Sequence, residues 1–259
     1  MPSLPNFVRR PIRFLYRLVR PVVDVRATLV GALNYPRYFW QLFRYASSPA
    51  AEKGVSWSLY PLLCDATIST PFDAHYLYLG DWALRLLLKS PAWEHVDVAS
   101  QLHWVAAVAA IKKVTFVDIR PAGMDIENLT VIAGSLMKLP FADRSVESVS
   151  CLHVVEHIGL GRYGDPLDPE GTTKAIAELA RIVAPQGTLL LALPVGRPQI
   201  AFNAHRVHSP SGIVQLAGKH GLKLKSFAVV GDDRTYHRMA QPGDFENCDF
   251  ACGMYEFTR

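Results

Sequence analysis

The sequence predicts an α/β protein whose core is a doubly wound, mainly parallel sheet of seven strands, with a helical extension at the N-terminus. From about residue 70 onward, short apolar runs alternate with stretches of helical periodicity. Strands that are apolar almost throughout are buried on both faces, which requires helices on both sides of a parallel sheet. Half of the 259 residues are hydrophobic, enough to fill a large core. The sheet domain is therefore expected to span residues 69–259.

The expected elements of this domain follow one another along the chain. A helix with a capping signal lies within Ser69–Ser90, and further helices are expected in residues 100–113 and 169–187. Strands are expected at residues 94–99, 114–119, 129–134, 145–152 and 188–195. The last two strands, residues 222–231 and 250–259, are expected to form an antiparallel pair at one edge of the sheet.

The expected extension, residues 1–68, begins with a basic segment. Eight arginines and a single acid, Asp24, give the first 45 residues a charge of +7, whereas the whole chain carries +4. On a helix, residues 7–20 would place apolar side chains on one side and arginines on the other. The aromatic stretch Tyr35–Tyr45 continues this pattern. The segment predicts either a helix lying in an anionic membrane surface or a helix packed on the protein's own core.

Several classes of protein are not expected. No run reaches the ~18 apolar residues that span a bilayer, and arginines interrupt every possible signal-peptide core. The four cysteines form no secreted-type framework: Cys151 is expected in the core, and no zinc knuckle is expected at Cys248 and Cys252. The basic segment is too short and too amphipathic to predict nucleic-acid binding. We expect a cytoplasmic protein that touches the inner face of the membrane through residues 7–45.

Two polar positions at strand ends indicate a site. Ligands of such sheets bind beyond the carboxyl ends of the strands, where Asp118 could accept hydrogen bonds from both hydroxyls of a ribose or simply form a turn. Residues 153–157 read His-x-x-Glu-His, the ligand order of inverted zinc proteases, which need both histidines on one helix. The preceding residues alternate and are β-branched, which favours a strand end. No metal is therefore expected, and Glu156 and His157 become candidates for either a pocket or a structural role.

The segment 133–158, with Leu139, Pro140, Phe141, Asp143 and Ser145 in order before the strand that ends near His157, resembles class I S-adenosylmethionine-dependent methyltransferases. The stretch "ELARIVAPQGTLLLALP" (residues 178–194) resembles the helix, turn and strand that follow in the same enzymes. This resemblance implies a Rossmann-like fold and S-adenosylmethionine as the cofactor.

A narrower resemblance covers most of the chain from about residue 33. The stretches "HVVEHIGLGRYGDPLDPEG", "PVGRPQIAFNAHRVHSP", "STPFDAHY" and "ACGMYEFTR" are similar to domain of unknown function 268, itself similar to class I methyltransferases. The resemblance implies a methyltransferase-like domain that acts on a glycan.

The positions expected to contact the cofactor are Asp97, Ala99, Ser100, Asp118, Ser135 and Leu136. Two of them depart from the methyltransferase pattern. The loop after the first strand, "VDVASQLHWV", carries Ala99, Gln101 and His103 in place of glycines that would let backbone approach the cofactor. Ser135 stands where an acid is usual. These departures leave open a non-catalytic protein that has lost its cofactor and serves as a scaffold in glycan assembly.

The polar loops supply the candidates for catalysis and for substrate binding. An imidazole has an unperturbed pKa near 6.5 and can deprotonate a hydroxyl, so His205 is the leading candidate base, with Asp165, Glu156 and His157 as the other catalytic candidates. An Asp-Pro turn explains Asp165 equally well. Candidate substrate-binding residues are Arg162, Asp168, Asn203 and Arg206. The leading hypothesis is a membrane-peripheral methyltransferase acting on a hydroxyl of a saccharide or lipid-linked glycan.

Overall fold

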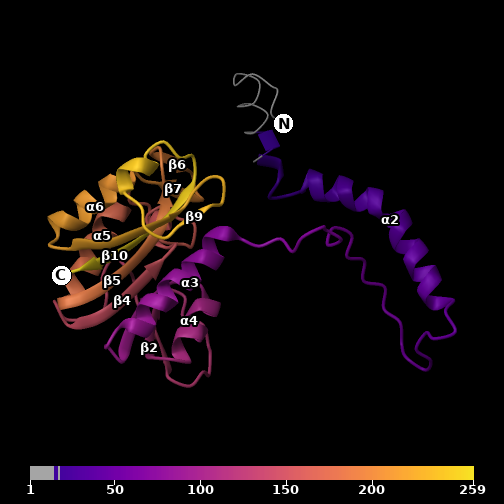
Figure 1. Cartoon of the computed structure of the whole chain (residues 1–259), viewed down its shortest axis with the longest axis horizontal. Helices are drawn as coiled ribbons and strands as arrows, with labels where there is room; N and C mark the ends of the chain where they lie inside the picture. Colours follow the sequence, from indigo (N-terminus) through magenta and orange to yellow (C-terminus); the bar gives the residue numbers. More distant parts are fainter. Residues whose placement is uncertain (1–14, 17) are drawn as a thin grey trace. The chain divides into compact units, whose positions relative to one another are not determined.

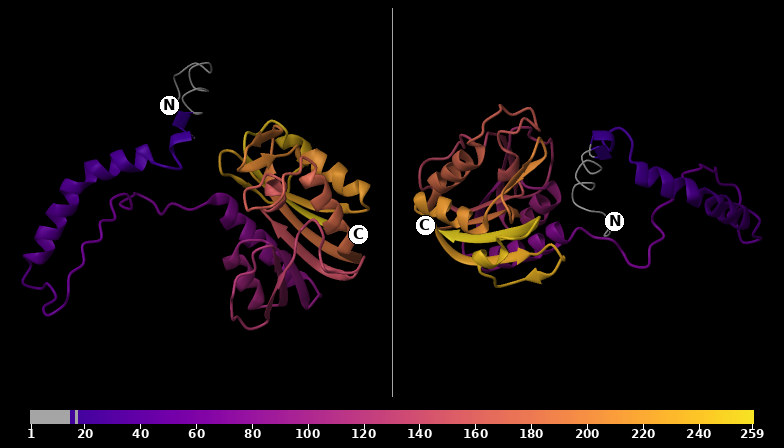
Figure 2. Two further views of the ribbon diagram at one scale, coloured as in Figure 1. Left: turned by 180° about the vertical axis from the view of Figure 1, so that it is seen from behind. Right: turned by 90° about the horizontal axis from the view of Figure 1, so that it is seen from above.

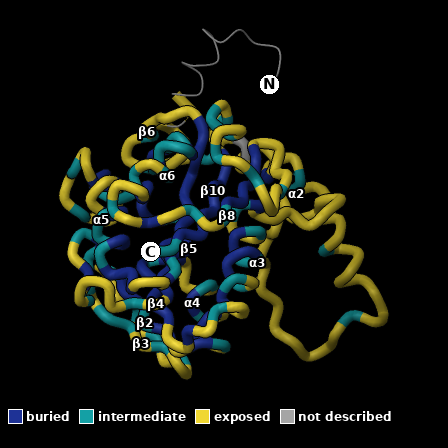
Figure 3. The backbone as a smooth tube through the Cα atoms, turned by 60° about the vertical axis from the view of Figure 1, so that its left-hand side comes forward, coloured by how far each residue is buried: buried dark blue, intermediate teal, exposed yellow. Residues whose placement is uncertain are grey.

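The computed structural model describes residues 15, 16 and 18–259. These residues fall into two compact units, one that ends at Pro71 and one that spans Phe72–Arg259. The main element of the first unit is helix α2 (Val25–Ala46), capped by Asp24, whose carboxylate accepts a hydrogen bond from the Ala27 N–H at 3.0 Å. Most of α2 is exposed (Figure 3), and Leu29, Leu33 and Phe43 are among its exposed large apolar side chains. Most of the predicted helix 7–20 lies outside the described residues. Among those described, no helix is both long and apolar enough to cross a membrane.

The second unit is built on one mainly parallel sheet with the strand order β3-β2-β1-β4-β5-β10-β8-β9 (Figure 1). Its strands are β1 Glu94–Val98, β2 Lys113–Asp118, β3 Leu129–Ala133, β4 Val146–Leu152, β5 Val183–Val195, β8 Lys223–Val230, β9 Tyr236–His237 and β10 Ala251–Thr258. Strands β1 to β5 run parallel, and β10 is antiparallel to both of its neighbours. The predicted fold is confirmed, and the two-residue β9 adds an eighth strand at the edge.

Helices cover both faces of this sheet (Figures 1 and 2). They are α3 Ala74–Lys89, α4 Leu102–Ala109, α5 Gly171–Ile182 and α6 Pro210–Lys219. Successive residues of β5 point to opposite faces: Leu189 and Leu191 pack in the core beneath α5 and α6, whereas Leu190 packs with α3 and α4. This explains why β5 is apolar at every position from Leu189 to Val195, since a strand covered on both sides has no face left for polar residues.

The structure corrects three details of the predicted elements. Strands β8 and β10 form the predicted antiparallel pair, but β10 also pairs with β5 and β9 lies outside β8, so β10 is an inner strand of the sheet. Helix α5 ends at Ile182, earlier than predicted, because β5 already begins at Val183 and includes Pro185. A small hairpin of β6 (Gln199–Ala201) and β7 (His205–Val207), which was not predicted, follows β5.

A buried polar chain joins β1 to β4 inside the sheet. The Ser150 hydroxyl donates to Asp97 at 2.5 Å, so its oxygen accepts from Nε2–H of His95 at 2.8 Å, and Nδ1 of His95 accepts from Ser148 at 2.8 Å. Burial, reinforced by the nearby charge of Lys112, lowers the pKa of His95 to about 3, whereas burial raises the pKa of Asp97 to about 6. The two groups therefore act oppositely on stability as the pH changes.

We expect His95→Gln to destabilise the protein at neutral pH, with a deficit that shrinks by roughly 1–3 kcal/mol between pH 6.5 and 4.5. The pKa of His95 is lower in the folded than in the unfolded state, so the wild type loses stability as the pH falls through this window. The variant has no titrating group at this position, so its stability does not fall for this reason. The raised pKa of Asp97 has the opposite effect, but both proteins retain Asp97. Urea unfolding at several pH values measures the difference. His103→Gln, at an exposed histidine of α4, is the control, and a deficit that stays constant with pH would refute the expectation.

Candidate functional site

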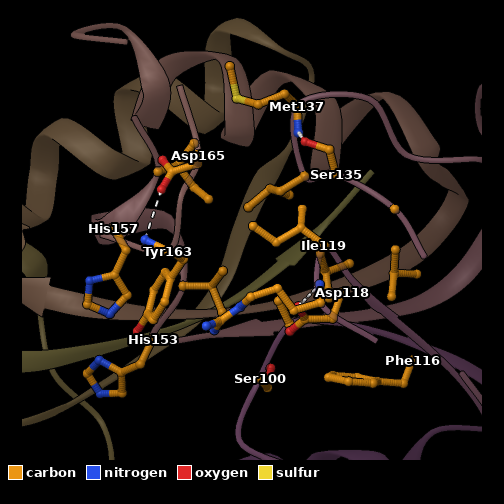
Figure 4. A pocket seen from close by; sticks show the side chains of 18 of the residues that line it. Ser100, Phe116, Asp118, Ile119, Ser135, Met137, His153, His157, Tyr163 and Asp165 are labelled. Atoms are coloured by element: carbon orange, nitrogen blue, oxygen red, sulfur yellow. Dashed lines mark hydrogen bonds between the residues drawn. The ribbon is translucent and has the colours of Figure 1, made fainter. Parts of the chain in front are cut away.

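A cavity of about 600 Å³ opens at the carboxyl ends of β1, β2, β3 and β4 (Figure 4). This is the edge where parallel sheets of this type bind ligands. Its wall is mostly apolar, with Phe116, Ile119, Leu136 and Met137 on the side of β2 and β3. A cavity of this volume accommodates a nucleoside-sized molecule.

Five of the six predicted cofactor residues line this cavity: Ala99, Ser100, Asp118, Ser135 and Leu136. Asp118 is the last residue of β2, and its Oδ1 accepts a hydrogen bond from the Arg120 N–H at 2.7 Å, which orients the carboxylate at the strand end. The other carboxylate oxygen of Asp118, Oδ2, makes no hydrogen bond to another described residue. Asp118 is the acid of this wall best placed for ribose hydroxyls.

Asp97, the sixth predicted cofactor residue, does not line the cavity. Its carboxylate is fully buried and accepts hydrogen bonds from the Ser100 N–H at 3.0 Å, Trp104 Nε1 at 3.0 Å and the Ser150 hydroxyl. In the structure Asp97 therefore holds the turn after β1, and any effect on a ligand is exerted through that turn.

The turn after β1 forms without the glycines of the methyltransferase pattern. Ala99 adopts a left-handed conformation with φ 56°, which costs a non-glycine residue about 1–2 kcal/mol. Its N–H donates to Val117 O at 2.9 Å, and the next residue, Ser100, accepts from the Leu152 N–H at 3.0 Å. These bonds stabilise the strained turn. The cavity keeps its volume with the side chains of Ala99 and Gln101 in place, so neither fills it.

The loop after β4, residues 159–168, forms another side of the cavity. Gly159, Gly161 and Gly164 all adopt positive φ, and both oxygens of Asp165 accept backbone N–H groups, from Gly159 at 2.7 Å and Tyr163 at 3.2 Å. The ring of Tyr163 lies 4.5 Å from the Arg120 guanidinium, so this loop meets the loop after β2 at the cavity (Figure 4). Asp165 thus shapes the loop in the way that the turn interpretation predicted.

Two other predicted site residues support the same loop. Arg206, buried on β7, donates to the carbonyl oxygens of Ile158 at 2.5 Å and Asp168 at 3.2 Å. The Asp168 carboxylate binds Lys174 at 2.7 Å and the Glu170 N–H at 2.9 Å. Asp168 lines the cavity at the ends of β1 to β4, whereas Arg206 does not. Arg206 does not line the second cavity, described below, either. Both residues hold the loop in place, and their roles in substrate binding remain predictions.

Gly159→Ala is expected to lower the free energy of unfolding by about 2–4 kcal/mol. A Cβ at Gly159 would collide with the backbone carbonyl of Asp168, which cannot move without opening the loop. Gly164→Ala is the matched control: its φ is +84°, but a Cβ there meets nothing within 4 Å, so it should cost only about 1 kcal/mol. Urea unfolding of the two variants makes the comparison, and equal losses would show that the loop tolerates the collision.

A second cavity, of about 410 Å³, adjoins the first and shares with it Ala99, Ser100, Gln101, His153, His157 and Tyr163. Its lining is rich in polar groups, including Asp73, His75, Glu156, Arg162 and His205. The rings of Tyr76 and Phe250 complete it. Of the predicted site residues, His205, Glu156, His157 and Arg162 therefore come together here, whereas Asn203 is exposed and lines neither cavity.

The His-x-x-Glu-His stretch does not form a helical metal pair. His153 follows the end of β4 with φ 57°, and residues 155–157 form the short 3₁₀ turn η1 (Val155–His157). His157 Nδ1 donates to Ala204 O at 2.6 Å, whereas the His153 ring bridges Glu156 Oε1 at 3.0 Å and Cys252 Sγ at 3.3 Å. The expectation that this stretch is a strand end rather than a protease helix agrees with these positions.

The pKa values of the histidines around the second cavity are shifted in different directions. Burial lowers the pKa of His75 and of His157, which favours neutral rings. Burial also opposes a charge on His153, but its contacts with Cys252 and Glu156 outweigh that effect and raise its pKa well above the usual range. His75, Cys252 and Phe250 were not predicted as site residues. The stretches that contain His75 and Cys252 indicated the family but no chemical role, and Phe250 lies in an expected strand.

The second unit has the class I methyltransferase fold. The [4+2]-cyclase SpnF has a TM-score of 0.52 with this chain at 14% identity, over 70% of this chain and 80% of SpnF. A provisionally assigned sarcosine dimethylglycine methyltransferase from Galdieria sulphuraria also has a TM-score of 0.52, at 15% identity over 70% of this chain and 85% of that one.

The Burkholderia thailandensis 1,6-didemethyltoxoflavin-N1-methyltransferase, solved with bound 1,6-didemethyltoxoflavin and S-adenosylhomocysteine, has a TM-score of 0.50 at 13% identity, over 72% and 79% of the two chains. Identities this low establish the fold alone, and one of these neighbours is a cyclase.

The family follows from the sequence of the central region. Residues 95–221 match the family model described as "Caenorhabditis protein of unknown function, DUF268". The resemblance inferred from the loops after β4 and β5 is thereby confirmed. No curated protein matches the chain.

Proposed function

We propose that this protein is an S-adenosylmethionine-dependent methyltransferase that acts on a hydroxyl of a saccharide or lipid-linked glycan. The observation that carries the proposal is the pair of adjoining cavities at the carboxyl edge of a methyltransferase-type sheet. The first is largely apolar with Asp118 at a strand end. The second is polar, contains His205, and shares a wall with the first. A methyl donor in one cavity and an acceptor in the other would meet at that shared wall.

The residues of the first cavity fit S-adenosylmethionine. Asp118 would bind the ribose hydroxyls, the apolar side chains of Ile119, Leu136 and Met137 would enclose the adenine ring, and the turn at Ala99 and Ser100 would face the methionine end. When bound, this cofactor supplies an activated methyl group on a sulfonium. The protein's contribution is to exclude water and to hold an acceptor oxygen in line with that methyl.

The second cavity suits a polyhydroxylated acceptor. Its imidazoles, carboxylates and guanidinium can donate to and accept from hydroxyls, and its aromatic rings can cover the apolar face of a sugar. His205 would accept the proton that the attacking hydroxyl loses, while Arg162, from the loop after β4, would bind the acceptor. Asp165 is a weaker candidate for the base because both of its oxygens already accept backbone N–H groups.

Calorimetric titration of the full chain with S-adenosylmethionine and with S-adenosylhomocysteine is the first test, followed by transfer of labelled methyl to saccharide acceptors. We expect micromolar binding of both compounds. Binding of neither would reject the proposal and favour the alternative, a non-catalytic scaffold, for which the glycine-free turn at Ala99 is the motivating observation. Binding without transfer to any saccharide would reject the glycan acceptor only.

We further propose that the protein works at the cytoplasmic face of a membrane, contacting it through residues 7–45. On α2 the exposed apolar side chains and the basic residues Arg37 and Arg44 support this, because an exposed apolar face with flanking arginines suits an anionic bilayer. Full-length protein should pellet with vesicles containing phosphatidylserine, and a chain beginning at Ser47 should not. Phe39→Glu with Phe43→Glu should reduce pelleting in the full-length protein. Equal pelleting of all three would reject the contact.

A further inference from the structure

Three side chains with metal-binding atoms converge beside the second cavity: His75 at the start of α3, His153 just after β4, and Cys252 on β10. One ligand atom from each lies within 4.8 Å of the other two. His153 Nε2 and Cys252 Sγ are 3.3 Å apart. Tetrahedral zinc with bonds of about 2.0–2.3 Å holds its ligand atoms about 3.3–3.7 Å apart, so this pair is already spaced for one ion.

Glu156 orients His153 in the manner of a residue that supports a metal ligand. Its Oε1 lies 3.0 Å from His153 Nδ1, so the ring donates there and directs Nε2 toward Cys252. Histidines that bind metals characteristically donate their other N–H to a carboxylate in this way. The Glu156 side chain is only 2% exposed, and its Oε2 has no hydrogen-bond partner among the described residues. An unpaired buried carboxylate is costly unless a positive charge lies nearby.

We infer that His75, His153 and Cys252 bind a zinc ion, with Glu156 as the carboxylate that orients His153. Two imidazoles and one thiolate are the donor types that zinc prefers, and three protein ligands leave a fourth position open. That position would face the second cavity, because His75 and His153 both line it. His75 is half-buried at a helix start and needs to approach by about 1 Å, which a side-chain rotation supplies.

The chain of contacts from Cys252 through His153 to Glu156 could instead suggest a cysteine nucleophile activated by His153 and Glu156. Burial argues against this. Cys252 is 0% exposed and lines neither cavity, so a substrate carbon cannot reach its sulfur. Burial does not prevent metal binding, because an ion held between the three side chains contacts the Cys252 sulfur from within the cluster. The sequence-based expectation of no metal concerned a site formed by His153 and His157. The cluster inferred here contains His153 but not His157.

The test uses the full chain, purified, incubated with zinc chloride and passed through a desalting column before metal analysis. We expect about one zinc per chain, falling below about 0.1 in Cys252→Ser and in His75→Ala. With cobalt in place of zinc, the wild type should show the charge-transfer band of a thiolate ligand and the visible bands of a tetrahedral site. Cys252→Ser should lose the charge-transfer band, whereas Cys248→Ser, a nearby cysteine outside the cluster, should keep both.

Circular dichroism of each variant separates metal loss from unfolding, and His75→Ala, at a half-buried helix start, is the variant expected to keep the fold. Zinc bound equally by wild type and Cys252→Ser, or a folded wild type that retains less than about 0.1 zinc, would overturn the inference. None of these measurements requires methyl transfer, so the metal site and the proposed function can fail separately.

Discussion

In calorimetric titrations, Asp118→Ala is expected to bind S-adenosylmethionine at least about 100-fold more weakly than wild type. A carboxylate that accepts hydrogen bonds from both hydroxyls of a ribose makes two charge-assisted bonds, each worth about 1.5–3 kcal/mol, and alanine replaces neither. The Arg120 N–H, which now donates to the carboxylate at 2.7 Å, would also lose its partner, but it lies near solvent and can bind water. The loss should therefore appear in affinity rather than in stability.

The matched control is Asp125→Ala, because Asp125 is an exposed acid in the same connection between β2 and β3 and does not line the cavity. It changes the charge of the protein by the same amount and should leave the affinity unchanged. Asp118→Asn should give an intermediate loss, since an amide oxygen can still accept one bond. If Asp118→Ala binds as tightly as wild type, the ribose is not bound at the end of β2, and the orientation of the cofactor given above is wrong.

Much of the fold could be predicted because its signals are local. The run Leu189 to Val195 is apolar at every position, which only a strand covered on both faces requires, and the helices on either side of it show their own periodicity. Asp118 was found in the same way, as an acid at the end of a buried run. The place of β10 was not predictable from such patterns, because its pairing with β5 joins Thr188 to Thr258, seventy residues apart.

The second cavity shows where reading the sequence alone falls short. Its walls combine His75, Glu156, His205 and Phe250, which only the sheet topology brings to one edge. The polar loops after β4 and β5 made His205 and Glu156 candidates. The stretch that contains His75 indicated the family but no chemical role, and Phe250 lay in an expected strand. Asp97 illustrates the converse. An acid near a strand end suggested a ligand contact, yet its partner Ser150 on the neighbouring strand takes up that carboxylate inside the sheet.

His205→Ala is expected to lower the rate of methyl transfer to the acceptor at least 100-fold, about the contribution of a single general base, with little change in S-adenosylmethionine affinity. His205 lines the second cavity and not the first, and its ring packs against Phe250 with the centroids 4.9 Å apart. His205→Ala therefore removes a proton acceptor from the cavity that would bind the saccharide. It leaves the wall of the first cavity at Asp118 unchanged. Single-turnover transfer of labelled methyl, measured with the cofactor saturating, isolates this step.

The shape of the pH profile distinguishes a base from a residue that only supports the cavity. A histidine base gives a rate that rises with pH as the imidazole loses its proton and then levels off, and His205→Ala should flatten that rise along with lowering the rate. A purely structural His205 would lower the rate equally at every pH or raise the acceptor KM alone. His237→Ala, at an exposed histidine on β9 that lines neither cavity, should keep the wild-type rate and profile. Transfer that survives in His205→Ala with its pH dependence intact would exclude this histidine as the base and leave Glu156 and His157, which line the same cavity, as the groups to test next.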